Sequence, residues 1–176
     1  MPARCMKTLI LFRHGKSDWD ADTGIDHDRP VNERGVRAAK TMGRFLKLSG
    51  QKPQSVVTSS AVRARTTVEL AMEAGKWGSS FRVTRALYEA TPSAVLEEVR
   101  SEPDATDTLL LAGHEPTTSE LLGLLVGGAR VHFPTACMAR VDFGASSWKE
   151  VAPGKGTLVW LVPPKLFTRG EFEFAE

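Results

Sequence analysis

The chain has 176 residues, of which 41% are apolar and 25% are charged. This size and composition predict one globular domain over residues 1–176 and exclude a disordered or fibrous protein. The net charge is only +2, and the lysines and arginines are scattered rather than gathered in a run. We therefore expect no nucleic-acid partner, and any binding of anions should come from a local pocket.

The cysteines and the apolar runs bear on the compartment. Cys5 and Cys137 lie far apart in the sequence, which favours free thiols in a reducing cytosol over a disulfide framework. The apolar run between Lys7 and Arg13 has only five residues, too few for a signal peptide. No run approaches the roughly 20 apolar residues of a membrane span. The sequence predicts a cytoplasmic protein with no membrane partner.

Strands and helices alternate over the first two thirds of the chain. The predicted elements are a strand over 7–12, a loop over 18–30, a helix over 32–48, a strand over 54–58, a helix over 61–74, a weak strand over 81–83, a helix from 91, a strand over 108–112, a helix over 116–126, and short strands over 137–143, 148–151 and 157–162. Asn32 can cap the first helix, and Ser59 and Ser60 can cap the second. Pro92 suits the first position of the third.

This order predicts the fold class. Alternating strands and helices indicate a three-layer α/β/α sandwich with a mainly parallel central sheet. The run over 108–112 is almost continuously apolar, as expected for a parallel strand covered on both faces. The C-terminal strands would extend the sheet with antiparallel pairs. Pro163 and Pro164 end the last strand, and the residues through Glu176 form a peripheral extension.

Charged residues follow three of the predicted strands. Arg13 and His14 end the first strand, Arg63 lies in the first turn after the second, and His114 follows the strand over 108–112. Because parallel strands end at the same edge of a sheet, these side chains should converge on one pocket. Two arginines and two histidines can hold a phosphate dianion. The start of the helix near Ala61 would add backbone donors.

The tripeptide after the first strand indicates a reaction. Arg13 supplies a planar fork of donors for phosphate. His14 supplies a nitrogen nucleophile that can carry a phosphoryl group. Gly15 allows the backbone to turn tightly beside a ligand. Together they suggest phosphoryl transfer through a phosphohistidine.

Three motifs carry a resemblance to a known family. They are L-F-R-H-G-K-S at 11–17, T-S-S-A-V-R-A-R-T-T at 58–67 and L-A-G-H-E-P at 111–116. In this order they resemble the histidine phosphatase, or phosphoglycerate-mutase-like, superfamily over residues 7–125. The short length and the segment Asp28-Arg29-Pro30 before Gly35 are most similar to the SixA-type phosphohistidine phosphatases, which lack the helical insertion of the mutases.

The resemblance implies a role for each matching residue. The implied set is His14 as the phosphorylated nucleophile, Arg13 and Arg63 on the phosphoryl oxygens, His114 as a second donor to the transferring group, Arg29 lining the pocket, and Ser17 as a hydroxyl that reaches phosphate. In the loop after the first motif the family often has an asparagine. This chain departs from that pattern with Asp18, Trp19 and Asp20.

The general acid is the remaining role. Glu89, in L-Y-E-A-T-P, lies at the position that best matches a family carboxylate, and Asp18 and Asp20 are reserves. A phosphohistidine leaves as imidazole, a better leaving group than an alkoxide, so a weak acid would be sufficient.

No metal and no other cofactor is predicted. The arginines and histidines supply the positive charge that phosphoryl transfer needs. The four histidines, at positions 14, 27, 114 and 132, also lack ligand spacing. His27, His132 and Arg65 are interpreted as structural residues.

Three functions remain open. The favoured one is a metal-independent phosphatase that acts on phosphohistidine in proteins, with a broad phosphomonoesterase of small phosphate esters as the alternative. A mutase is disfavoured because no insertion closes over the site. A phosphate- or phosphopeptide-binding module without turnover is a different class, and the intact His14 argues against it.

Overall fold

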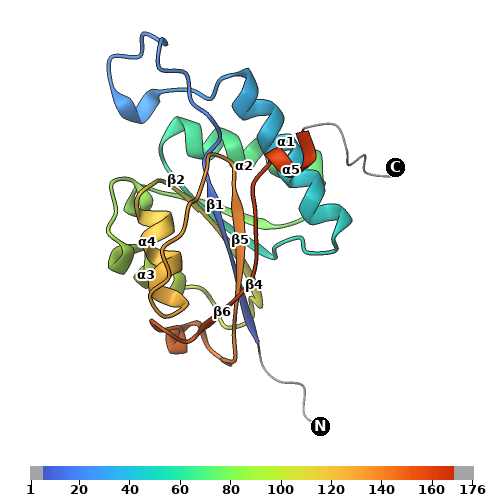
Figure 1. Cartoon of the computed structure of the whole chain (residues 1–176), viewed down its shortest axis with the longest axis vertical. Helices are drawn as coiled ribbons and strands as arrows, with labels where there is room; N and C mark the ends of the chain where they lie inside the picture. Colours follow the sequence, from blue (N-terminus) through green and yellow to red (C-terminus); the bar gives the residue numbers. More distant parts are fainter. Residues whose placement is uncertain (1–5, 169–176) are drawn as a thin grey trace.

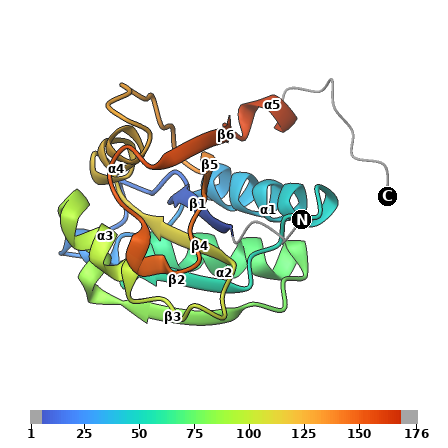
Figure 2. The same ribbon diagram turned by 90° about the horizontal axis from the view of Figure 1, so that it is seen from below.

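The structure is a computed structural model that describes residues 6–168 (Figure 1). Within them, six strands form one sheet in the order β3-β2-β4-β1-β5-β6. The strands are β1 (Lys7–Arg13), β2 (Ser55–Ser59), β3 (Ser80–Thr84), β4 (Thr108–Gly113), β5 (Met138–Phe143) and β6 (Gly156–Val162). Strands β1 to β4 pair in parallel, whereas β5 and β6 pair antiparallel. The predicted sheet is confirmed, and Figure 2 shows β3 and β6 at its opposite edges.

Helices cover both faces of the sheet. They are α1 (Glu33–Leu48), α2 (Val62–Gly75), α3 (Pro92–Arg100), α4 (Thr117–Leu125) and the short α5 (Lys165–Thr168). Helices α3 and α4 lie on one side, and α1, α2 and α5 lie on the other (Figure 1). The chain steps in one direction along the sheet from β1 to β3 and returns between β3 and β4. Right-handed crossovers in opposite directions place their helices on opposite faces.

Each central strand contributes to two hydrophobic cores. In β1, Leu9 and Leu11 pack with the α3–α4 layer, and Ile10 and Phe12 pack with the α1–α2 layer. All four side chains are at most 1% exposed. Successive side chains of a strand point to opposite faces. A strand buried on both faces therefore reads as an unbroken apolar run, as β1 and β4 do.

The helix caps agree with the sequence in part. Asn32 accepts a hydrogen bond from the Gly35 amide at 2.9 Å, as predicted for α1. The predicted serine cap of α2 is wrong, because Ala61 holds the cap position without a side-chain hydrogen bond. The hydroxyls of Ser59 and Ser60 instead contact His114 and His27, at 2.8 and 3.0 Å. Ser59 therefore contacts a histidine of the site, while its hydroxyl also accepts from the Ala61 amide at 3.3 Å.

The predicted strand over 148–151 is also wrong. Trp148–Glu150 is a 3-10 helix, η3, and Ser147 caps it. The Trp148 side chain is completely buried and donates a hydrogen bond to the carbonyl oxygen of Thr106 at 2.7 Å. The buried Trp148 side chain therefore anchors this turn. Aromatic residues are also typical of strands, which explains the wrong prediction.

The structure can be compared with the expectations about free cysteines and about membrane-spanning segments. Cys137 is a buried free thiol, and burial raises its pKa to about 12, while Cys5 lies outside the described residues. Between residues 6 and 168 no helix has both the length and the apolar character to cross a membrane. The extension predicted after Pro164 begins with α5, and its residues 169–176 are outside the described range.

Candidate active site

The register of the central strands brings two histidines together. β1 and β4 pair so that Arg13 lies opposite Gly113. The next residues, His14 and His114, therefore leave the sheet side by side, with ring centroids 5.2 Å apart. β2 pairs with the other edge of β4. The convergence predicted at the carboxyl edge of the sheet is confirmed for these elements.

Short contacts fix the loop after β1. The Gly15 amide donates to the hydroxyl oxygen of Thr67 at 2.8 Å, and that hydroxyl donates to the carbonyl oxygen of Arg63 at 2.6 Å. A Cβ atom at Gly15 would lie 2.9 Å from the Gly35 carbonyl oxygen at the start of α1. Only glycine fits this approach without a shift of the backbone. The loop is thus held between α1 and α2.

One nitrogen of His14 is free for chemistry. Nδ1 lies 2.8 Å from the carbonyl oxygen of Gly15, which can only accept, so Nδ1 carries the proton and Nε2 carries a lone pair. Burial, together with the charges of the neighbouring arginines, lowers the pKa of His14 to about 4, against the opposing effect of the Gly15 hydrogen bond. His14 is therefore a neutral imidazole at pH 7.

His114 is neutral for similar reasons. Burial, with smaller contributions from the neighbouring His14 and Arg63, lowers its pKa to about 3. Its Nε2 lies 2.8 Å from the Ser59 hydroxyl. Its Nδ1 is buried and has no hydrogen-bond partner among residues 6–168.

Three arginines surround this pair with donors that the protein leaves unused. Arg13, Arg29 and Arg63 line one cavity of about 290 Å³ together with both histidines. Buried and without a partner in the described part of the chain are Arg13 Nε, Arg29 Nε, Arg29 Nη1, Arg63 Nε and His114 Nδ1. A buried donor left unpaired costs about 1–3 kcal/mol. Such a group of nitrogens is suited to an oxyanion, whose oxygens can accept from all of them.

Asp26, at the start of the 3-10 helix η1 (Asp26–Asp28), holds two of these arginines. Its carboxylate accepts from Arg29 at 2.7 Å, from Arg63 at 2.9 Å and from the Tyr88 hydroxyl at 3.1 Å. Burial alone would raise the pKa of Asp26, but the hydrogen bonds and charge of Arg63 outweigh it and lower the pKa. Asp26 is thus an anion at the edge of the site. The sequence prediction missed it, although its spacing of three residues from Arg29 was a usable signal.

Two of the residues implied by resemblance also reach this cavity. Ser17 is buried and Arg29 is nearly so, and both line it. The guanidinium carbon of Arg29 lies 3.5 Å from the centroid of the Trp19 ring, a cation–π contact. Trp19 is 72% exposed, so an aromatic surface stands open at the rim of the cavity.

The proposed acids lie farther out. Glu89 is exposed and lines a neighbouring cavity of about 440 Å³ rather than the one that holds Arg13 and His14. The two cavities share Arg63, His114 and Glu115. Asp18 and Asp20 line neither of them. The role of Glu89 as general acid stays a prediction, and Glu115, which sequence reasoning did not consider, is the carboxylate common to both cavities.

The residues interpreted as structural lie outside the main cavity. Arg65 is exposed and pairs with Glu69 at 2.9 Å on the outer surface of α2. His27 packs against Tyr88 with ring centroids 4.9 Å apart. Over residues 6–168 no three His, Cys, Asp or Glu side chains are grouped as metal ligands. The predicted independence from metals is left to experiment.

The neutral histidines make the stability of the fold dependent on pH. In the unfolded chain they would take up protons near pH 6.5, but in the folded state they do so only near pH 4 and 3. The unfolded state thus binds more protons below pH 6.5, and the free energy of unfolding should fall by a few kcal/mol, on the order of 1.4 per pKa unit, as the pH decreases to about 4. Urea unfolding at several pH values measures this loss. A His14→Asn variant should lose less free energy of unfolding over this pH range than the wild type. An equal loss in the two proteins would contradict a buried, neutral His14.

Known proteins share both the motifs and the fold. The model of the histidine phosphatase superfamily (branch 1) matches residues 9–92. The uncharacterized protein Rv1276c of Mycobacterium tuberculosis (strain ATCC 25618 / H37Rv) is 35% identical over 165 residues, covering 88% of this chain and 100% of that protein. SixA from Nakamurella multipartitia has a TM-score of 0.76 and 27% identity over 90% of this chain and 96% of its own. A protein histidine phosphatase SixA complexed with tungstate has a TM-score of 0.74 and 25% identity, over 90% of this chain and 98% of its own.

These relatives confirm the resemblance and the fold class that the sequence indicated. The first motif ends β1, the second begins in β2 and runs into α2, and the third bridges β4 and α4. The chain belongs to the histidine phosphatase superfamily.

Proposed function

We propose that this protein is a metal-independent phosphatase that removes the phosphoryl group from phosphohistidine in proteins. Membership of the superfamily supports a phosphatase- or mutase-type enzyme. The observation that carries the proposal is the set of unpaired buried nitrogens on Arg13, Arg29, Arg63 and His114, residues that line the same cavity as His14 with its free Nε2. A similar structure is that of a protein histidine phosphatase with tungstate, which is a tetrahedral oxyanion like phosphate.

The reaction has two steps. In the first, the Nε2 lone pair of His14 attacks phosphorus, the bond from phosphorus to the leaving nitrogen breaks, and the leaving imidazole keeps the electron pair and takes a proton from the general acid, for which Glu89 is the predicted residue. In the second, water attacks the phosphoryl group on Nε2 and gives a proton back to that carboxylate, the P–N bond breaks with its electron pair returning to Nε2, and orthophosphate forms. Arg13, Arg63 and His114 hold the phosphoryl oxygens while charge spreads over them. Because His14 is neutral at pH 7, no proton has to leave it before attack.

A protein substrate suits the shape of the site. Two adjoining cavities of about 290 and 440 Å³ share three lining residues, and the exposed Trp19 lies at the rim of one of them. An exposed aromatic next to a binding cavity is a common anchor in protein recognition. A small ester would not need the second cavity or the aromatic rim.

The test compares two substrates in the presence of EDTA. Wild-type protein is incubated with a phosphohistidine-bearing carrier protein and, separately, with p-nitrophenyl phosphate, and released phosphate is measured. We expect turnover of both without added metal, with the carrier as the better substrate by kcat/KM.

Each other result points elsewhere. Turnover of the ester alone would replace the proposal with the broad phosphomonoesterase. A requirement for metal would contradict the mechanism. Binding of orthophosphate without turnover of either substrate would indicate a binding module.

A further inference from the structure

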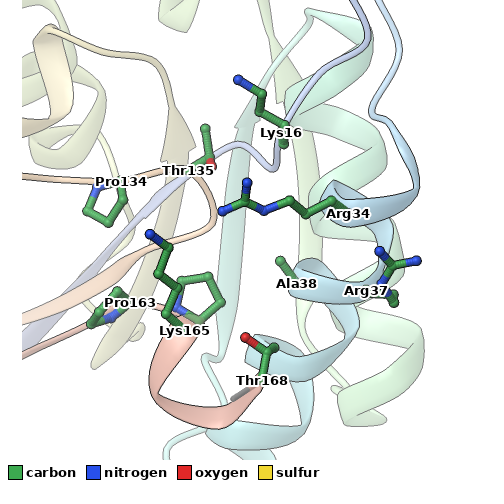
Figure 3. A pocket seen from close by; sticks show the side chains of 10 residues that line it. Lys16, Arg34, Arg37, Ala38, Pro134, Thr135, Pro163, Lys165 and Thr168 are labelled. Carbon is green, nitrogen blue, oxygen red and sulfur yellow. The ribbon is translucent and has the colours of Figure 1, made fainter.

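A third cavity, of about 300 Å³, opens beside the catalytic one. Four cationic side chains, Lys16, Arg34, Arg37 and Lys165, line it, and no carboxylate does. We call these four residues the basic subsite. Figure 3 shows Arg34 extending from α1 and Lys165 from the opposite wall toward the same space. No pattern in the sequence indicates the cluster, because its members come from the loop after β1, from α1 and from α5.

Most of this positive charge is not neutralised by the residues that the structure describes. Within residues 6–168, the side chains of Lys16, Arg34 and Lys165 make no hydrogen bond or ion pair. Arg37 has one ion pair, at 3.7 Å, with Glu33, whose side chain is 95% exposed. Arg34 is also the second residue of α1, where the helix dipole disfavours a cation. A chain of net charge +2 thus concentrates cations at a place where its own structure does not stabilise them.

The basic subsite is continuous with the catalytic cavity. Lys16 and Thr135 line both of them. Lys16 follows the Gly15 turn, two residues after His14 in the chain. A ligand whose phosphoryl group faces His14 can therefore continue over Lys16 toward Arg34 and Lys165.

We propose that the basic subsite binds acidic side chains next to the phosphorylated residue of a protein substrate. The inference rests on the proposed function, since it takes the phosphoryl group at His14 as the reference point. An extended peptide can cross from one cavity to the next, and its Asp or Glu side chains would pair with the exposed ends of Arg34 and Lys165. Flexible, solvent-exposed cations suit a peptide of variable conformation better than a small rigid ligand.

The experiment uses two phosphohistidine peptides that differ only in Glu or Gln at the positions flanking the phosphorylated residue. For wild type, kcat/KM for the Glu peptide should exceed that for the Gln peptide by about tenfold, mainly through KM, because the small contributions of several charge pairs add up. The double variant R34E/K165E should abolish or invert this ratio. The preference should also weaken as salt rises from about 0.05 to 0.5 M.

A matched control makes the same change of charge elsewhere. Arg44 and Lys47 are exposed on α1 and do not line the cavity, so R44E/K47E should keep the wild-type ratio. A loss of the ratio in both double variants would show a general effect of net charge and overturn the subsite.

A binding measurement separates this proposal from the proposed function. The His14→Ala protein is titrated with each peptide by calorimetry, which needs no turnover. The titrations are then repeated with a protein that carries R34E/K165E in addition to His14→Ala. We expect tighter binding of the Glu peptide only when Arg34 and Lys165 are present. Equal affinities and equal kcat/KM values would overturn the subsite while leaving the phosphatase intact. A preference in binding without turnover of either peptide would instead remove the proposed function and keep the subsite.

Discussion

Replacing His14 with alanine is expected to lower kcat for p-nitrophenyl phosphate on the order of 10⁴-fold or more, because the substitution removes the nitrogen that receives the phosphoryl group. The wild type, quenched in alkali during turnover of a labelled substrate, should retain label on the protein, and the variant should retain none. Orthophosphate should still bind to the variant, since Arg13, Arg29 and Arg63 remain in the cavity.

The exposed His132 provides the matched control. A His132→Ala variant should keep the wild-type rate and the labelled intermediate. Thermal unfolding of both variants shows whether a loss of activity is a loss of fold. If His14→Ala keeps more than about 1% of the activity and still retains label, the nucleophile is a different group, and His114, 5.2 Å away by ring centroids, is the first to examine.

Patterns in the sequence predicted the elements that are defined by burial on both faces. β1 and β4 were found because a strand covered by helices on each side has few polar residues. The turn at Trp148 was missed because a single buried aromatic in a short segment looks the same in a strand or in a 3-10 helix. What distinguishes them is the hydrogen bond to Thr106, more than 40 residues away in the chain.

The residues of the site also divide into those that the sequence predicted and those that it did not. His14, Arg63 and His114 were predictable because each follows a strand, and the ends of parallel strands share one edge of the sheet. Asp26 begins the short 3-10 helix η1, and its place in the site depends on Arg63 and Tyr88, which are 37 and 62 residues away. Contacts of this range carry no periodic signal. The basic subsite was hidden for the same reason, since scattered cations become a cluster only after the chain folds.

Replacing Arg63 with methionine is expected to lower kcat on the order of 10²–10³-fold, the usual cost of removing one well-placed donor from a developing charge. Arg63 is buried, lines the cavity beside His14 and keeps Nε free of any partner in the described structure. Methionine fills similar space but also removes the ion pair with Asp26 at 2.9 Å, so thermal unfolding is measured alongside and kcat is compared at a temperature where both proteins are folded. Arg65→Met, on the same helix but exposed and paired with Glu69, should leave kcat unchanged. If both variants lose activity equally, the effect is one of general charge, and the oxyanion role of Arg63 is wrong. If only Arg63→Met loses it, and affinity for orthophosphate falls as well, the guanidinium acts on the phosphoryl group in both the bound and the reacting state.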